Sequence, residues 1–449
     1  MKLVSNPAQR PLDGTVTIPG DKSIGHRALL FSLLSETPMR VLGLGDGADN
    51  GRSAKAIVQL GATVRRDGPS PGGGLVIQGT GLRGMRAPEG AIDCGNSGTT
   101  IRLLCGLLAG QPFATGLVGD ESLSTRPMAR VIDPLRRMGA TCTGVARGAD
   151  IVPPLTVGPA TRALSAIAIE LEMASAQVKT ALLLAGLYAD GTTSVTEPGP
   201  SRDHTERMLA YLGAPLVAER LTSHVTTTGW NGRLAGEGFS VPSDPSSSAF
   251  LVAAAILAGA REVRLPNVCI NPTRTGFLDA IAAMGGEVVL EDRDDHGPEP
   301  LATLVVRGAA HELRATEIAG DLAVRSIDEL PVLAVIAARA RGTTTVRDAG
   351  ELRVKESDRI ATTCAMLRAF GIACEAHRDG FTVEGRPDRP FDAAHVHAEG
   401  DHRIAMAAAV GGLVAAGETV VEDADNVATS YPGFAAALAS LGAVVRADS

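Results

Sequence analysis

The N-terminal region holds a group of residues suited to binding an anion. The segment Pro19-Gly20-Asp21-Lys22-Ser23-Ile24-Gly25-His26-Arg27 combines an ammonium, a hydroxyl and a guanidinium with two glycines. It fails the spacing of a P-loop, which needs Gly-x4-Gly-Lys-Ser/Thr. If a helix begins near Asp21, Ser23 and Arg27 lie one turn apart on the same face. The segment therefore predicts an anion site at a helix N-terminus, with a capped helix and a solvated basic face as the alternative.

Six further segments place polar or charged side chains just before apolar, helix-like runs. At such positions the backbone N–H groups and the helix dipole favour an anion. For each segment, an N-cap or a structural salt bridge is the alternative explanation. The candidate residues are, in chain order, Asn96 and Gly98, Arg126, Ser175 and Gln177, Asp328, Lys355 with Glu356 and Arg359, and His402 with Arg403.

Three local expectations accompany these segments. Pro127 is expected in the first turn of a helix, which would place Arg126 at the helix mouth, with the acidic residues just before it as alternative partners. Asp328 is expected to cap the helix that follows it. Lys355 and Arg359 are four residues apart and are expected on one helix, where like charges repel unless an anion lies between them.

The composition of the 449-residue chain limits the classes of partner that it can bind. Apolar residues make up 45% and charged residues 20%, and the formal net charge is −8. With no basic block, one Trp and three Tyr, the chain lacks the charge and the stacking residues that nucleic-acid binding needs. Its longest uncharged apolar runs, near 249–260 and 404–417, are too short to span a bilayer. Cations kept at the ends of core elements in a net-acidic chain predict small, multiply charged anionic substrates.

The N-terminus and the cysteines indicate where the protein works. The first seven residues, Met1–Pro7, contain no apolar run of the kind that export signals carry. The six cysteines form no C-x-x-C pair and show no metal-ligand spacing, a pattern typical of reduced core thiols. We expect a cytoplasmic monomer with no metal and no cofactor.

The elements that must position these residues repeat six times along the chain. A large apolar residue followed by Gly recurs at spacings of 78, 74, 72, 86 and 71 residues. Gly enters the left-handed conformation cheaply, so each phrase predicts the end of a helix with a strand after it. A unit of roughly 70 residues is too small to bury its own core, which favours six α/β units in two three-unit domains. The phrases are Leu60-Gly61-Ala62, Met138-Gly139-Ala140, Leu212-Gly213-Ala214, Met284-Gly285-Gly286, Phe370-Gly371-Ile372 and Leu441-Gly442-Ala443.

Two polar or Pro-containing stretches mark the expected domain boundaries. One lies at Pro19-Gly20 and the other at Gly238–Pro245, which is rich in Pro and Ser. We expect residues 20–241 to form one domain and residues 1–19 with 242–449 the other, with substrates in the cleft between them. The glycines at 72–74 are expected to turn a hairpin between Thr63–Arg66 and Leu75–Gln78.

The charged segments together resemble the 5-enolpyruvylshikimate-3-phosphate (EPSP) synthase family from Pro19 to Pro432. The motifs P-G-D-K-S-I-G-H-R, G-N-S-G-T, R-P-M-A-R, S-A-Q-V-K, R-V-K-E-S-D-R and D-H-R-I-A-M occur in family order. The resemblance implies six α/β units in two domains, an inside-out α/β barrel-like arrangement that closes on its substrates. It also implies 3-phosphoshikimate 1-carboxyvinyltransferase activity, in which the enolpyruvyl group of phosphoenolpyruvate moves to the 5-hydroxyl of shikimate 3-phosphate. The steps are addition and elimination through a tetrahedral intermediate, with release of phosphate.

The same resemblance implies a role for each candidate residue. Asp328 is implied as the base, either Glu356 or Lys22 protonates the methylene carbon, and His402 lines the site. Phosphoenolpyruvate is implied to contact Lys22, Asn96, Gly98, Arg126, Gln177, Arg359 and Arg403. Shikimate 3-phosphate is implied to contact Ser23, Arg27, Ser175, Gln177, Arg202, Asp328 and Lys355.

The chain departs from the family pattern at two places, and the first of them resembles the divergent, herbicide-tolerant class. No Lys occurs in Asn426–Pro432, where many members carry one, and Ala176 stands where a second Ser is common. Gly98 stands where tolerant members tend to have Ala. We therefore expect glyphosate to inhibit the enzyme, and Gly98→Ala to raise the inhibition constant.

Two other functions fit parts of the pattern. The sister enzyme that transfers enolpyruvate to UDP-N-acetylglucosamine has the same fold but uses a loop cysteine as acid, and neither Cys94 nor Cys105 lies in such a loop. An inactive anion-binding protein of this fold is the other alternative. The intact Lys22, Asp328 and Glu356 argue against it.

Overall fold

The computed structural model describes residues 1–68, 73–308 and 313–448, and the contacts within it divide the chain into two compact units. The N unit is Lys22–Val241, and the C unit joins Met1–Asp21 to Pro242–Ser449. The chain therefore passes from one unit to the other twice. Across the described ranges, no helix has the length and the apolar run needed to cross a membrane.

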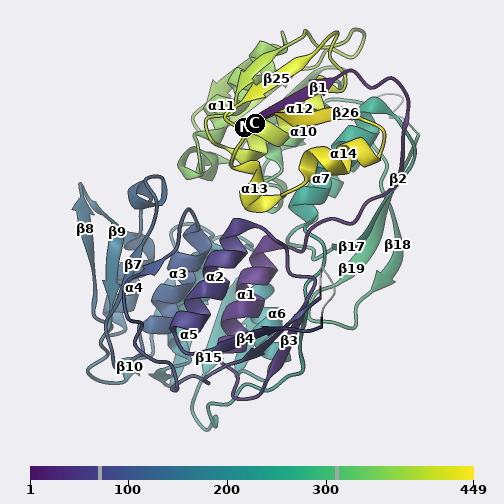
Figure 1. Cartoon of the computed structure of the whole chain (residues 1–449). Helices are drawn as coiled ribbons and strands as arrows, with labels where there is room; N and C mark the ends of the chain where they lie inside the picture. Colours follow the sequence, from purple (N-terminus) through teal and green to yellow (C-terminus); the bar gives the residue numbers. More distant parts are fainter. Residues whose placement is uncertain (69–72, 309–312, 449) are drawn as a thin grey trace. The chain divides into compact units, whose positions relative to one another are not determined.

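The N unit alternates helices with short strands (Figure 1). Its elements are α1 (Lys22–Leu33), β3 (Met39–Leu42), α2 (Ala48–Gln59), β4 (Thr63–Arg66), β5 (Leu75–Gln78), β6 (Ile92–Asp93), α3 (Gly98–Leu108), β7 (Thr115–Val118), η1 (Leu123–Thr125), α4 (Ala129–Arg137), β8 (Cys142–Arg147), β9 (Asp150–Val157), β10 (Leu164–Ser165), β11 (Ala168–Glu170), α5 (Ala176–Gly186), β12 (Ala189–Asp190), β13 (Thr192–Thr196), α6 (His204–Tyr211), β14 (Leu216–Glu219), β15 (Thr222–Thr226) and β16 (Gly238–Ser240).

The C unit contains both chain ends and follows the same alternation. Its elements are β1 (Lys2–Asn6), β2 (Leu12–Thr15), α7 (Pro245–Ala258), β17 (Ala260–Cys269), α8 (Gly276–Ala283), β18 (Val289–Asp294), β19 (Leu301–Gly308), β20 (Glu317–Ile318), α9 (Gly320–Arg325), α10 (Leu330–Ala337), β21 (Thr343–Val346), η2 (Gly350–Val354), α11 (Arg359–Ala369), β22 (Cys374–His377), β23 (Gly380–Glu384), β24 (His395–His397), α12 (His402–Gly412), β25 (Thr419–Glu422), α13 (Val427–Ser430), α14 (Phe434–Ser440) and β26 (Val444–Asp448).

Small four-stranded sheets recur through both units, which confirms the prediction of a mixed α/β protein. Among the described residues there are six, three in each unit, and in each one a parallel pair is followed by two antiparallel pairs. Parallel neighbours need a crossover, and helices supply it, as in β6-α3-β7 and β20-α10-β21. The expected β4–β5 hairpin is present, and Gly72 of its turn lies outside the described residues. The orders are β16-β3-β5-β4, β6-β7-β9-β8, β11-β13-β15-β14, β2-β17-β19-β18, β20-β21-β23-β22 and β24-β25-β1-β26.

The six Gly-containing phrases end six helices, as the sequence predicts. In each phrase the large apolar residue is buried and the Gly that follows it has φ between +71° and +107°. The next residue donates its backbone N–H to the carbonyl five residues earlier, as Ala62 does to Ile57 at 2.9 Å. This pattern is the Schellman motif, which supplies hydrogen bonds to backbone carbonyls that lack a partner at the C-terminal end of a helix. The helices that end this way are α2, α4, α6, α8, α11 and α14.

A second set of helices is buried on nearly every side. In the N unit α3 contacts both α1 and α5, and in the C unit α7, α10 and α12 contact one another (Figure 1). Almost every residue of these helices is buried. A helix enclosed by protein in this way presents functional groups mainly at its ends. Five of these six helices carry predicted site residues at or beside their N-terminal ends, while Arg126, Arg202 and 355–359 lie elsewhere.

Candidate active site

In the N unit, candidate residues lie where buried helices begin. Lys22 is the first residue of α1, Gly98 is the first of α3, and Gln177 is the second of α5. The first backbone N–H groups of a helix have no partner within the helix, and the helix dipole makes this end positive. Lys22 adds its ammonium group, which lies 3.2 Å from Asp49 Oδ2. These ends are therefore suited to oxyanions.

Arg126 and Asn96 form a pair suited to an anionic group. Arg126 Nη2 donates to Asn96 Oδ1 at 2.6 Å, while Asn96 Nδ2 donates to Asp120 Oδ2 at 3.0 Å. Arg126 Nε is buried, and it has no hydrogen-bond partner among the described residues. A buried donor left unpaired is costly, so an acceptor that reached it would bind favourably. Arg126 is thus held by a neutral amide and keeps its charge for a ligand.

Gln177 joins α5 to α3 beside this pair. Its Oε1 accepts from Arg102 Nη1 at 2.8 Å, and its Nε2 donates to Thr99 Oγ1 at 2.9 Å. A methyl group added to Gly98 would lie 2.8 Å from Arg102 Nη1 and 3.2 Å from Arg126 Nη1. The sequence analysis gave Arg102 no role. Its place on α3, one turn after Gly98, is the signal that could have found it.

Two arginines implied for shikimate 3-phosphate contact hydroxyl groups around α1. Arg202 Nη1 lies 3.2 Å from Ser23 Oγ and donates to it. Arg27 is buried, and it donates through Nε to Thr205 Oγ1 at 2.8 Å and through Nη2 to Thr180 Oγ1 at 2.9 Å. These contacts tie α1 to α5, to α6 and to the loop before α6.

Ser175 occupies the N-cap position of α5, as the sequence predicts. Its side chain accepts from Val178 N at 3.5 Å, and its own N–H donates to Glu197 Oε1 at 2.8 Å. The cap side chain therefore satisfies one of the first helical N–H groups, while Glu197 fixes the backbone just before the helix.

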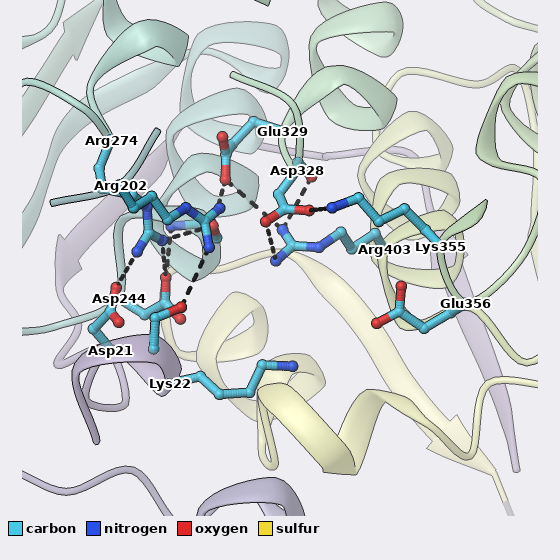
Figure 2. Close-up of polar contacts among 12 residues, drawn as sticks. Asp21, Lys22, Arg202, Asp244, Arg274, Asp328, Glu329, Lys355, Glu356 and Arg403 are labelled. Atoms are coloured by element: carbon cyan, nitrogen blue, oxygen red, sulfur yellow. Dashed lines mark hydrogen bonds and ion pairs between the residues drawn. The ribbon is translucent and has the colours of Figure 1, made fainter. Parts of the chain in front are cut away.

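In the C unit, Asp328 is surrounded by three cations, and Figure 2 shows two of them, Lys355 and Arg403. Its Oδ1 lies 3.2 Å from Arg359 Nη1 and 3.8 Å from Lys355 Nζ, and its Oδ2 lies 3.8 Å from Arg403 Nη2. Its backbone carbonyl accepts from Arg403 Nη1 at 3.0 Å. The expectation that Asp328 caps α10 is wrong, because Glu329 takes the N-cap position. The Asp328 carboxylate is directed to the cations instead.

Arg359 is fully buried and holds three carboxylates in place. Besides Asp328, it contacts Asp401 Oδ2 at 2.8 Å through Nε and Glu356 Oε2 at 2.7 Å through Nη2. Burial would lower the pKa of Arg359, but Asp401, Glu356 and Asp328 raise it above its usual range. Burial would likewise raise the pKa of Asp401, but Arg359 holds it below its usual range. Each group therefore stays charged because of the other.

Two local expectations are wrong. Lys355 and Arg359 do not share a helix, since η2 ends before Lys355 and α11 begins at Arg359. Asp358 starts the new helix by accepting from two backbone N–H groups, as an N-cap does. Pro127 is not in a first helical turn, because α4 begins at Ala129.

A buried network beside Asp328 was missed by the sequence analysis (Figure 2). Arg274 Nη1 lies 2.7 Å from Asp21 Oδ2, and its Nη2 lies 3.2 Å from Asp244 Oδ1 and 3.0 Å from Ser246 Oγ. Ser246 Oγ donates in turn to Glu329, the neighbour of Asp328. Burial would lower the pKa of Arg274, but Asp21 and Asp244 raise it. The partners of Arg274 are far from it in sequence, so no local motif reveals them.

Many of the predicted residues thus lie in two groups, one in each unit. His402 is the buried first residue of α12, next to Asp401, which caps that helix through Arg403 N at 2.9 Å. In the described parts of the chain, no group of three or more His, Cys, Asp or Glu side chains is arranged to hold a metal ion. The N unit brings together Asn96, Gly98, Arg126 and Gln177, and the C unit brings together Asp328, Lys355, Glu356, Arg359 and Arg403.

Comparisons with known proteins point to one enzyme family. Residues 7–438 match the family described as EPSP synthase (3-phosphoshikimate 1-carboxyvinyltransferase). The chain is 47% identical over 438 residues to 3-phosphoshikimate 1-carboxyvinyltransferase of Geobacter sulfurreducens, covering 98% of each protein. It is 46% identical over 439 residues to the protein of that name from Alkalilimnicola ehrlichii, covering 98% of this chain and 95% of the relative. The solved EPSP synthase of Acinetobacter baumannii is similar with a TM-score of 0.88 at 38% identity, and all of both chains is covered.

Proposed function

We propose a residue-by-residue assignment for this chain, which belongs to the EPSP synthase family and transfers the enolpyruvyl group from phosphoenolpyruvate to shikimate 3-phosphate. The activity is that of a 3-phosphoshikimate 1-carboxyvinyltransferase, a shikimate-pathway enzyme of aromatic amino acid biosynthesis. Full-length similarity to proteins named for this activity favours it over the UDP-N-acetylglucosamine enzyme and over an inactive anion-binding protein.

Phosphoenolpyruvate carries a phosphate and a carboxylate, and the proposed contacts match both groups. Arg126 supports this assignment most directly, because its buried Nε lacks a partner in the described structure. Charge-assisted hydrogen bonds from guanidinium to such oxyanions are roughly twice as strong as neutral ones. Asn96 orients Arg126, and Gly98 leaves room beside it. The complete proposed set is Lys22, Asn96, Gly98, Arg126, Gln177, Arg359 and Arg403.

Shikimate 3-phosphate offers a phosphate, a carboxylate and ring hydroxyls, and its proposed contacts are correspondingly mixed. Hydroxyl groups and guanidinium groups of the N unit suit the anionic groups. Asp328 and Lys355 of the C unit suit the ring hydroxyls, since one accepts and the other donates hydrogen bonds. The complete proposed set is Ser23, Arg27, Ser175, Gln177, Arg202, Asp328 and Lys355.

The contacts of Asp328 carry the proposed chemistry. Three cations within 3.2–3.8 Å favour its ionised form, which a base requires. As the 5-hydroxyl oxygen attacks C2 of phosphoenolpyruvate, Asp328 takes the hydroxyl proton, and C3 gains a proton from Glu356 or Lys22. The tetrahedral intermediate then loses a proton from C3 and expels phosphate, which leaves the enol ether on the shikimate ring.

We extend the proposal to organisation and location. Three sheets of one pairing pattern in each unit support six repeated α/β units in two three-unit domains of the inside-out barrel-like kind. We propose that residues of both units act on the same two substrates, in a monomer. A cytoplasmic location is supported by six buried free cysteines, which suit a reducing compartment.

The proposal is tested by measuring phosphate release from phosphoenolpyruvate with each acceptor. We expect release with shikimate 3-phosphate and none with UDP-N-acetylglucosamine. Asp328→Asn keeps the shape of the side chain but removes the base, so kcat should fall by roughly 10²–10⁴-fold. Glu351→Gln is the matched control, because Glu351 contacts Lys355 at 2.9 Å but has no proposed chemical role. Equal losses in both variants would reject Asp328 as the base.

A further inference from the structure

A buried ion-pair cluster lies beneath the residues proposed to bind shikimate 3-phosphate. Lys179 of α5 is 4% exposed, and its Nζ lies 2.6 Å from Glu197 Oε2 and 2.7 Å from Glu206 Oε1. Burial would lower the pKa of Lys179, but Glu206 and Glu197 raise it above its ordinary value. Burying three charges costs several kcal/mol per ion, roughly, before their attraction offsets it. Apolar side chains could fill the same space at no such cost, so packing alone does not explain the cluster.

The two carboxylates differ in what else they contact. Glu197 Oε1 accepts from the backbone N–H of Ser175 at 2.8 Å, and Glu197 Oε2 accepts from Ser201 Oγ at 2.8 Å. Glu206 Oε1 accepts from Ser223 Oγ at 2.8 Å, in β15. Glu197 therefore connects the segment that carries Ser175 to the segment that carries Ser201 and the next residue, Arg202. Glu206 contacts neither segment in this way.

The segment between Glu197 and Arg202 needs such a tie. It reads Glu-Pro-Gly-Pro-Ser-Arg and connects β13 to the start of α6 without helix or strand of its own. Its two prolines restrict φ but remove backbone donors, so the segment has few bonds with which to hold its shape. The Glu197–Ser201 bond closes it into a short loop, and Arg202 follows directly after that bond.

We propose that Glu197 is a positioning residue for shikimate 3-phosphate, which fixes Ser175 and Arg202 relative to each other, while Lys179, which also pairs with Glu206, offsets part of its charge. The inference rests on the proposed assignment of Ser175 and Arg202 to this substrate. Without Lys179, a bare carboxylate beneath an anion-binding segment would repel the substrate. With Lys179, the carboxylate can accept two hydrogen bonds and still leave the segment favourable to an anion.

The matched pair Glu197→Gln and Glu206→Gln tests the proposal. Both variants remove one carboxylate charge facing Lys179, so both should lower the melting temperature. Glu197→Gln should also raise the dissociation constant of shikimate 3-phosphate, measured by calorimetry, about tenfold, or ~1.4 kcal/mol. The KM for phosphoenolpyruvate should stay within about twofold in both variants, as should the shikimate 3-phosphate affinity of Glu206→Gln. Equal affinity losses in the two variants, or none in either, would overturn the proposal.

Two further variants keep the test decisive. Ser201→Ala removes one bond to Glu197 but leaves the ion pairs intact, so it should weaken shikimate 3-phosphate binding about threefold even if Glu197→Gln folds poorly. Unchanged affinity in Ser201→Ala would count against the positioning role. Arg202→Ala tests the underlying assignment itself. If Arg202→Ala binds normally, the assignment fails; if it binds weakly while Glu197→Gln and Ser201→Ala bind normally, the positioning role alone fails.

Discussion

The N unit and the C unit use positive charge in different ways. Arg126 of the N unit donates to the amide of Asn96, and its Nε has no partner in the described structure. Arg359 of the C unit is fully buried and contacts Asp328, Glu356 and Asp401. The charge of Arg126 remains available to an anion. The charge of Arg359 is matched by carboxylates, which it keeps ionised and in place.

The difference suggests a division of labour within one reaction. A carboxylate in contact with a guanidinium is held in the ionised form, so it is suited to accept a proton rather than to give one. Asp328 and Glu356 both have such contacts. Lys22 of the N unit carries an ammonium group that can donate protons, and this group lies 3.2 Å from Asp49 Oδ2. From this comparison we propose that Asp328 of the C unit acts as the base and that Lys22 of the N unit acts as the acid.

The largest predicted effect separates Lys22 from Glu356 as the group that protonates the methylene carbon. In D2O with both substrates, proton exchange should carry deuterium into the methylene group of phosphoenolpyruvate. Lys22→Met should slow this exchange by roughly 10²–10⁴-fold at saturating phosphoenolpyruvate, whereas Glu356→Gln should slow it by less than about tenfold. Asp49→Asn is the control, because it keeps Lys22 and should retain exchange. The reverse ranking of Lys22→Met and Glu356→Gln would break the division between the units.

The next prediction compares the two arginines directly. Arg359→Met leaves buried carboxylates without their cation, so it should lower the free energy of unfolding by about 3–5 kcal/mol. Arg126→Met removes a bond to a neutral amide and should cost less than about 1.5 kcal/mol, while raising the KM for phosphoenolpyruvate. Urea denaturation and steady-state kinetics measure both effects. Similar losses of stability in the two variants would show that the two charges are not used differently.

The repeated elements could be predicted from sequence because their cause is local. At Gly61 and its five counterparts, a single residue must enter the left-handed region, and Gly does so at little cost. The Ser175 cap is local as well, since its partner is Val178. The group around Arg126 was found because its motifs carry the resemblance to the EPSP synthase family.

The missed features depend on contacts between distant residues. Arg274 pairs with Asp21 across 253 positions, and no periodicity or motif links them. In the sequence, Lys179 looks like any other helix residue. Its two ion-pair partners, Glu197 and Glu206, lie outside α5 and are not revealed by a local pattern. The wrong prediction that Lys355 and Arg359 share a helix has a local cause. Asp358 followed by a long run of helix-forming residues is an N-cap signal, and it should have separated Lys355 from α11.

A smaller effect is predicted at Gly98, which lies beside Arg102 and Arg126. The added methyl of Gly98→Ala would lie 2.8 Å from Arg102 Nη1 and 3.2 Å from Arg126 Nη1, so both guanidinium groups must shift. Glyphosate is longer than phosphoenolpyruvate and should suffer more from this crowding. We expect the inhibition constant of glyphosate to rise about tenfold, and the KM for phosphoenolpyruvate to rise by less.

Gly51→Ala is the matched control for Gly98→Ala. Gly51 also lies in a helix, α2, and an added methyl there meets nothing within 4 Å. The inhibition constant of this variant should equal that of the parent protein. If Gly98→Ala behaves in the same way, the space beside Arg126 does not determine how glyphosate binds.

The smallest predicted effect is a pH dependence of stability that arises from Asp401 of the C unit. Arg359 holds the pKa of Asp401 below its usual range, so the unfolded chain takes up the Asp401 proton at a higher pH than the folded protein does. The stability from this contact is therefore fully present above about pH 4, near the ordinary Asp pKa, and is lost as pH falls through the folded pKa. One group changes the slope of the unfolding free energy against pH by at most about 1.4 kcal/mol per pH unit.

Urea denaturation of the parent protein and of Asp401→Asn should show a stability difference that is constant at neutral pH and shrinks below about pH 4. Arg126→Met, compared with the parent in the same way, should show a constant difference, because its partner Asn96 does not titrate. A difference for Asp401→Asn that stays constant down to pH 3, roughly one unit below the ordinary Asp value, would mean that Arg359 does not stabilise the ionised carboxylate.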